Sequence, residues 1–127
     1  MQLGETSFNP IQQKSSEIRD LSSCIAQYFS YDSTDNNEAT SLRHDIAQAI
    51  KTDGLLLFKL LIRAKRATSL RRRRRSMRIT HIAIQNLFNY CRGLEKDNIK
   101  EKEYVYLLRK ELNQLRQQLS LWKENIQ

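Results

Sequence analysis

Turn-forming residues are scarce in this chain, and their scarcity constrains the fold more than any other feature. Three glycines and one proline occur in 127 residues. An all-β protein needs a turn after each short strand, and Gly and Pro supply many of those turns. Leu, Gln, Glu, Lys and Arg are abundant instead, and all five favour helix. The composition therefore predicts an all-α fold, a small bundle of four to five helices.

Apolar residues recur at helical spacing in the first part of the chain. Asn9 followed by Pro10 is a helix-start signal, so the first helix is predicted to begin there and to end near Phe29. The polar segment 30–37 predicts a turn, and a second helix is predicted over 38–52. The residues expected to be buried in these two helices are Ile11, Ile18, Leu21, Ile25, Tyr28, Phe29, Ala39, Leu42, Ile46, Ala49 and Ile50.

The segment 55–92 carries apolar residues on most helical faces. Gly54 is expected to cap the preceding helix and Gly93 to end this one, because glycine favours the left-handed cap. A helix that is apolar all round from Leu55 onward belongs in the core of a bundle. The Thr-Ser pair at 68–69 either interrupts the helix or caps a new one, so the segment holds one helix or two. The later core positions are predicted to be Met77, Ile79, Ile82, Ile84, Leu87, Phe88 and Cys91.

The segment 95–127 has the most regular apolar pattern. Spacings of three and four alternate along it, as in a heptad seam. They predict a long, amphipathic, coiled-coil-like C-terminal helix. This helix either packs on the helical domain 1–94 or pairs with a second chain or a partner helix, and the pattern is compatible with both. The seam residues are Val105, Leu108, Leu112, Leu115, Leu119, Trp122 and Ile126.

Five consecutive arginines, Arg71 to Arg75, lie in a segment without acidic residues. This basic central segment, 54–94, holds eleven of the 22 basic residues and none of the 14 acidic ones. Adjacent like charges repel one another unless a partner neutralises them. The concentrated positive field therefore predicts a polyanionic partner, and nucleic acid is the commonest polyanion.

Arginine suits that partner because its guanidinium forms paired hydrogen bonds with phosphate oxygens. The sequence has no dedicated base-reading group, so recognition of phosphates or shape is expected, with RNA and DNA both open. The predicted nucleic-acid-binding residues are Lys59, Arg63, Lys65, Arg66, Arg71, Arg72, Arg73, Arg74, Arg75 and Arg78.

Two alternatives use the same features. The chain could be a helical adaptor whose C-terminal heptads recruit a partner helix and whose basic surface docks on an acidic protein. The arginine run could also act as a nuclear import signal. The run resembles the arginine-rich motifs of RNA-binding regulators, but Arg71 to Arg75 alone carry that similarity. Basic-zipper transcription factors are excluded by geometry, because their basic helix runs directly into the zipper, whereas Gly93 separates Arg78 from Val105 here.

Other function classes find little support in the sequence. No nucleophile, paired carboxylates or glycine-rich phosphate loop stands out, so a non-catalytic protein without cofactor or small-molecule substrate is expected. Cys24 and Cys91 have no metal-ligand spacing and are predicted to be core residues of a reducing compartment. No apolar run is long enough to span a membrane, and Met1 to Pro10 does not resemble a leader. An intracellular protein, nuclear or cytoplasmic, is therefore expected.

Overall fold

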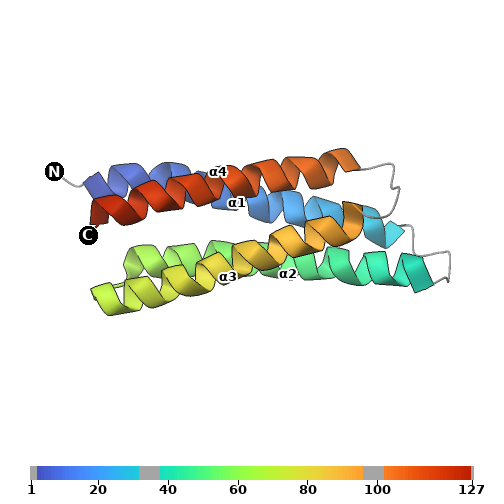
Figure 1. Ribbon diagram of the computed structural model, residues 1–127, viewed down its shortest axis with the longest axis horizontal. Helices are drawn as coiled ribbons and strands as arrows, with labels where there is room; N and C mark the ends of the chain where they lie inside the picture. The colour runs from blue at the N-terminus through green and yellow to red at the C-terminus, as the bar shows by residue number, and fades with distance from the viewer. Residues whose placement is uncertain (1–2, 32–37, 96–101, 127) are drawn as a thin grey trace.

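The computed structural model describes residues 3–31, 38–95 and 102–126, and all of them except 67–69 are α-helical (Figure 1). α1 spans Leu3–Tyr31, α2 Glu38–Arg66, α3 Leu70–Glu95 and α4 Lys102–Ile126. The all-α prediction is confirmed, with four helices and no strand in the described ranges. Side chains are described over 8–29, 42–95 and 103–122. The turn predicted at 30–37 lies mostly outside the described residues.

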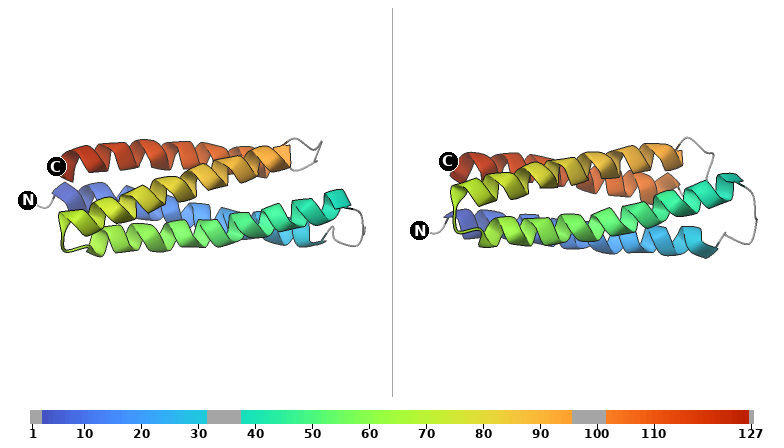
Figure 2. Two further views of the ribbon diagram at one scale, coloured as in Figure 1. Left: turned by 60° about the horizontal axis from the view of Figure 1, so that its bottom comes forward. Right: turned by 90° about the horizontal axis from the view of Figure 1, so that it is seen from below.

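The helices form an antiparallel bundle in which chain neighbours lie side by side (Figures 1 and 2). α1 packs on α2 and α4, and α3 packs on the same two helices, so α1 and α3 lie on a diagonal. Because the direction alternates along the chain, the α2–α3 connection lies at the same end as the start of α1 and the end of α4 (Figure 2). The two halves of the basic segment, in α2 and α3, therefore meet at one end of the bundle.

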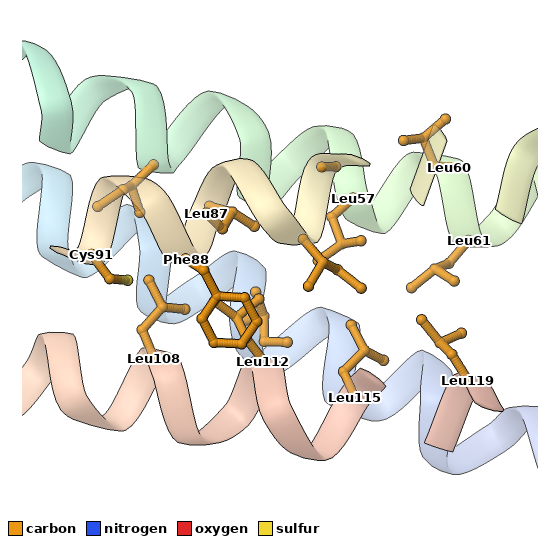
Figure 3. Close-up of a cluster of buried hydrophobic side chains, with 14 of the residues drawn as sticks. Leu57, Leu60, Leu61, Leu87, Phe88, Cys91, Leu108, Leu112, Leu115 and Leu119 are labelled. Carbon is orange, nitrogen blue, oxygen red and sulfur yellow. The ribbon is translucent and has the colours of Figure 1, made fainter. Parts of the chain in front are cut away.

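The core runs the length of the bundle and is lined by all four helices (Figure 3). The predicted seam of α4 lies in it, with Val105, Leu108, Leu112, Leu115 and Leu119 fully buried and Trp122 nearly so. The side chain of Ile126 is outside the described residues. The seam therefore packs on the chain's own helices, which is one of the two uses predicted for it. The long coiled-coil-like helix is not confirmed, because α4 has 25 residues and α1 and α2 have 29 each.

Gly54 lies inside α2, so the prediction that it caps a helix was wrong. α2 continues to Arg66, and Gly54 is buried where α2 crosses α1. A Cβ at this position would lie 2.5 Å from Oγ and 2.7 Å from Cβ of Ser22. Glycine is therefore needed here for close helix contact, which the sequence signal for a left-handed cap does not distinguish. Gly93 also lies inside α3, where a Cβ would be 3.3 Å from Cδ1 of Ile46.

α1 begins at Leu3 rather than at Asn9, and Pro10 lies within the helix. A proline there loses one backbone hydrogen bond and strains the preceding turn. Burial offsets that loss. Phe8 is fully buried, and its ring lies 5.2 Å from the ring of Trp122 in α4, tilted by 56°. Tertiary packing thus extends the helix beyond the local start signal.

Several apolar residues predicted to be buried are exposed instead. In α2 the buried stripe runs through Ala47, Ile50, Leu57 and Leu61, and the predicted all-round burial from Leu55 was wrong. The helix has neighbours on two sides only, so its outer face remains in solvent. Cys91 is buried as predicted, whereas Cys24 is exposed. The other predicted core residues that are exposed are Tyr28, Leu42, Ile79 and Ile82. Ala39 lies outside the described side chains.

The Thr-Ser pair at 68–69 separates two helices, which decides the open question about 55–92. Ser69 caps α3, because its Oγ accepts a hydrogen bond from the backbone N–H of Arg72 at 3.2 Å. The backbone N–H of Arg73 donates to the Ser69 carbonyl at 3.1 Å. The hairpin of α2 and α3 is therefore closed by a short connection with a defined helix start.

Candidate nucleic-acid interface

The ten predicted binding residues gather at the end of the bundle where α2 leads into α3. Four come from the last turns of α2 and six from the first turns of α3. All are exposed except Arg73, which is half-buried. Antiparallel packing of α2 on α3 brings both groups to the same level of the bundle. We call these ten side chains the basic end.

Arg73 differs from its four neighbours in the run, because it holds the helices together. Its Nε donates to the carbonyl of Ala64 at 3.1 Å, and Nη2 lies 3.4 Å from the carbonyl of Ala67 and 3.5 Å from that of Lys65. The carbonyls of Ala64 and Lys65 belong to the C-terminal end of α2, where a positive charge is favoured, and that of Ala67 belongs to the connection that follows. The guanidinium also lies over the ring of Trp122, 5.5 Å from its centroid. This structural role was missed from the sequence.

A signal for Arg73 was nevertheless present. Arg73 stands four residues before Met77, and spacings of three and four continue through the buried residues of α3. Arg73 is thus the first position of a seam on the helix face that packs inward. The seam is hidden in the sequence because two of its members are polar. Its residues are Arg73, Met77, Thr80, Ile84, Leu87, Cys91 and Leu94.

Four other arginines of α3 point away from that seam. Arg71, Arg74, Arg75 and Arg78 are spaced i, i+3, i+4 and i+7, so they share one helical face and are exposed. From Arg71 to Arg78 the helix rises about 10 Å. The arginine run therefore presents a compact stripe of guanidinium groups rather than charges spread evenly around the helix.

α2 contributes a second row beside this stripe. Lys59, Arg63 and Arg66 are exposed and share one side of the helix, at spacings of four and three. Lys65 points elsewhere: its Nζ lies 5.3 Å from the centroid of the Phe8 ring of α1. The basic end is thus two helices wide, with one of its cations directed toward α1 and another, Arg73, inside the helix junction.

The electrostatics of the basic end are unbalanced. Within the described residues, the ion pairs join Lys14 to Glu17 and Glu111, Arg19 to Asp20, and Arg109 to Glu95. None of these pairs includes a residue of the basic end. The first turn of α3 has no acidic residue, and its arginines lie at the positive end of the helix dipole. Both effects favour the approach of an anion.

Among the described side chains at this end no aromatic ring is fully exposed, and half-buried Phe58 is covered by the Arg19 guanidinium. Phe8 and Trp122 are buried, and Tyr90 is half-buried near the C-terminal end of α3, far from the arginine run. Single-stranded nucleic acids are commonly held by bases stacked on exposed aromatic rings. The described side chains therefore suit contact with phosphates better than contact with bases.

Cys91 and Asp53, two groups with a shifted pKa, are not residues of the basic end. Burial, and next the nearby Glu95, raise the pKa of the Cys91 thiol to about 12, so it stays protonated near neutral pH. Burial raises the pKa of Asp53, while a hydrogen bond from Tyr90 opposes that shift. Among the described residues no group of three potential ligands for a metal ion comes together. The expectation of a non-catalytic protein stays a prediction.

Comparison with known proteins identifies no relative: no family model matches the chain, and neither the curated proteins nor the solved structures contain a significant match. Within the described residues none of the helices qualifies as a membrane-spanning segment. The function must therefore be inferred from the residues and their arrangement.

Proposed function

We propose that this protein binds nucleic acid without catalysis, through the basic end of the bundle. One observation carries the proposal: exposed basic side chains from two helices gather at one end, and no described carboxylate pairs with them. Phosphate groups spaced along a polyanion would neutralise them and release bound counterions. An isolated anion would neutralise only one or two.

The contacts expected are to the phosphate backbone. Arg71, Arg74 and Arg78 line the outer face of α3, and guanidinium groups bind phosphate oxygens through paired hydrogen bonds. Arg63 and Lys59 of α2 widen the contact across the neighbouring helix. Such contacts position a protein on nucleic acid but carry little sequence information. We therefore expect RNA and DNA to bind with weak sequence preference, at affinities typical of non-specific binding.

Salt dependence tests the proposal directly. Fluorescence anisotropy with labelled duplex DNA, duplex RNA and single-stranded RNA would give the affinity at several salt concentrations. If about six phosphates are neutralised, the log–log slope should be about −5 for duplex DNA. Removing three guanidinium groups, in the variant with Arg71, Arg74 and Arg78 replaced by Gln, should flatten that slope by about 2 to 3.

A matched variant separates a local surface from total charge. Lys51, Arg92 and Lys110 are exposed and lie outside the basic end, so replacing all three by Gln removes the same charge. This control should keep a slope close to that of the parent. Equal flattening in both variants would show attraction to overall charge, and a parent that does not bind at low salt would refute the proposal.

A further inference from the structure

A small apolar surface lies on the outer side of the α2–α3 pair, beside the basic end. Leu56 of α2 is 42% exposed, and Ile79 and Ile82 of α3 are 39% and 55% exposed. Leu56 lies ten residues before the last residue of α2, and the two isoleucines lie nine and twelve residues after the first residue of α3. Since the hairpin is antiparallel, all three lie at about the same level.

Contacts of their helical neighbours place these residues on a common side. Leu56 follows Asp53 by three residues, and Asp53 accepts a hydrogen bond from Tyr90 of α3, so Leu56 borders the α3 side of α2. Ile79 precedes buried Ala83 by four residues, and Ala83 precedes Tyr90 by seven. Ile79 therefore borders the α2 side of α3. We call Leu56, Ile79 and Ile82 the aliphatic patch.

Basic residues adjoin the aliphatic patch on both helices. Lys59 and Arg63 share a stripe with Leu56 at spacings of three and seven, and Arg75 precedes Ile79 by four residues. The segment 54–94, which supplies this entire surface, contains no acidic residue. An occupant must therefore combine apolar groups with negative charge.

We infer that the aliphatic patch and its basic border dock an acidic amphipathic helix of a partner protein. The outer groove of two packed helices accepts a third helix, whose apolar side chains at spacings of three and four would cover Leu56, Ile79 and Ile82. Its carboxylates would pair with Lys59, Arg63 and Arg75. This inference goes beyond the proposed function, because contacts with phosphates make no use of exposed aliphatic groups.

The size of the patch favours a helix over a lipid surface. Binding to a membrane interface grows with the apolar area that enters the lipid, and three partly exposed side chains offer little of it. A helix needs no more than a few anchors along one face, and charged pairs at the border fix its register and direction.

A designed peptide tests the inference. The probe is a fluorescent peptide of about 18 residues with leucines at spacings of three and four and glutamates elsewhere. A peptide of the same composition in scrambled order is the matched control. The first should bind the full chain and gain helix content, and the scrambled peptide should bind at least about tenfold more weakly.

Two variants assign the surface. Replacing Leu56, Ile79 and Ile82 by Ser should weaken peptide binding at least about tenfold while leaving the salt slope for duplex DNA unchanged. The control replaces Tyr104, Tyr106 and Leu121, exposed apolar residues of α4, by Ser and should bind the peptide as the parent does. Circular dichroism should show all these proteins folded, because every changed side chain is exposed.

The result that overturns the inference is equal binding of patterned and scrambled peptides, or equal weakening in both serine variants. Binding to vesicles of anionic lipid that depends on the aliphatic patch, without peptide binding, would assign the surface to membranes instead. Loss of duplex binding in the aliphatic variant would show that the patch belongs to the nucleic-acid interface. Failure of the proposed function alone would leave peptide binding intact.

Discussion

α3 and α4 both contain a seam with spacings of three and four, but only that of α4 is visible in the sequence. Every described seam position of α4 is apolar and buried. The seam of α3 includes Arg73 and Thr80, and its helix also carries Ile79 and Ile82 outside the seam. Thr80 is accommodated because its Oγ1 donates to the Ser76 carbonyl at 2.7 Å.

The difference shows that polar residues at core-facing positions, such as Arg73 and Thr80, conceal a packing seam in the sequence. In α4 every apolar residue at the seam spacing that the structure describes is buried, although Tyr104, Tyr106, Leu107 and Leu121 outside the seam are exposed. α3 must both fill the core and present a basic and partly apolar outer surface. Single exposed apolar side chains need no explanation, so Ile79 and Ile82 are informative only because they lie beside basic residues in a segment without acidic ones.

The largest effect is expected when the two helices are changed in the same way. Replacing Leu112 and Leu115 of α4 by Ser should destabilise the fold by several kcal/mol, because both are fully buried. The same double change at Ile79 and Ile82 of α3 should alter stability by less than about 1 kcal/mol. Urea unfolding followed by circular dichroism measures both. Similar losses would mean that the outer face of α3 is covered.

Sedimentation of the parent and of these variants also tests the other predicted use of the seam. If α4 paired between chains, association and thermal midpoint would depend on protein concentration, and the Leu112 and Leu115 variant would become a folded monomer. If the seam fills the chain's own core, that variant should lose helix content at every concentration. Homodimer formation through the heptads stays a prediction until this is measured.

Gly54 and Gly93 provide the next comparison. Gly54→Ala should destabilise the protein by about 1 to 3 kcal/mol, because its Cβ would overlap Cβ of Ser22, which has no room to turn away. Gly93→Ala meets only the flexible end of Ile46 and should be neutral or stabilising by up to about 1 kcal/mol. Adding Ser22→Gly should rescue Gly54→Ala. A fully stable Gly54→Ala protein would contradict the close contact of α1 and α2.

Within the arginine run, Arg73 and Arg74 should differ in kind. Arg73→Gln removes the contacts with two α2 carbonyls and with the Ala67 carbonyl, and the contact with Trp122, so it should destabilise the fold by about 1 to 2 kcal/mol. Arg74→Gln should leave stability unchanged and weaken nucleic-acid binding. Thermal unfolding and anisotropy on the same samples separate the two effects. Identical behaviour of the two variants would remove the distinction.

Small effects are expected at two ionisable groups, of which the first, Asp53, lies between α2 and α3. Burial raises the pKa of Asp53 above its ordinary value of 3.8. The folded state therefore holds the proton more tightly, and stability falls as the pH rises from about 3.8 through the folded pKa. Asp53→Asn keeps an acceptor for Tyr90 and should raise stability at pH 7 by less than about 1 kcal/mol. A decrease at pH 7 would contradict this direction.

Lys14 lies between α1 and α4, and there the charged form of the side chain is stabilised by folding, unlike that of Asp53. A hydrogen bond with Glu111 raises the pKa of Lys14 above 10.5, and Nζ also lies 2.8 Å from Oε1 of Gln114. This pair stabilises the fold below about pH 10.5, and its contribution is lost as the pH rises through the folded pKa. Lys14→Gln should therefore lower stability at pH 7. Neutral behaviour of Lys14→Gln would show that the pair is fully screened.

The sequence predicts the helical class well but predicts poorly the positions where one helix contacts another. Helical class and the α4 seam follow from local patterns, because each rests on residues close together in the chain, whereas the pair at 68–69 left one helix or two open. Gly54 and Pro10 were misread because their positions are decided by Ser22 and Trp122, which lie far away in the sequence. The gathering of Lys59 with the arginines of α3 likewise needed the hairpin geometry.

Arg73 caps the C-terminal end of α2, and this contact should tolerate changes in the number of arginines in the run. Arg73 acts from the position four residues before Met77, and the core fixes Met77. Because the run consists of one residue type, deleting or inserting a single arginine leaves an arginine at that position. The displacement falls on Ser69 and the exposed connection at 67–69, where a chain accommodates it most easily. With a uniform run at this junction, the number of arginines can vary while one of them still contacts the carbonyls at the end of α2.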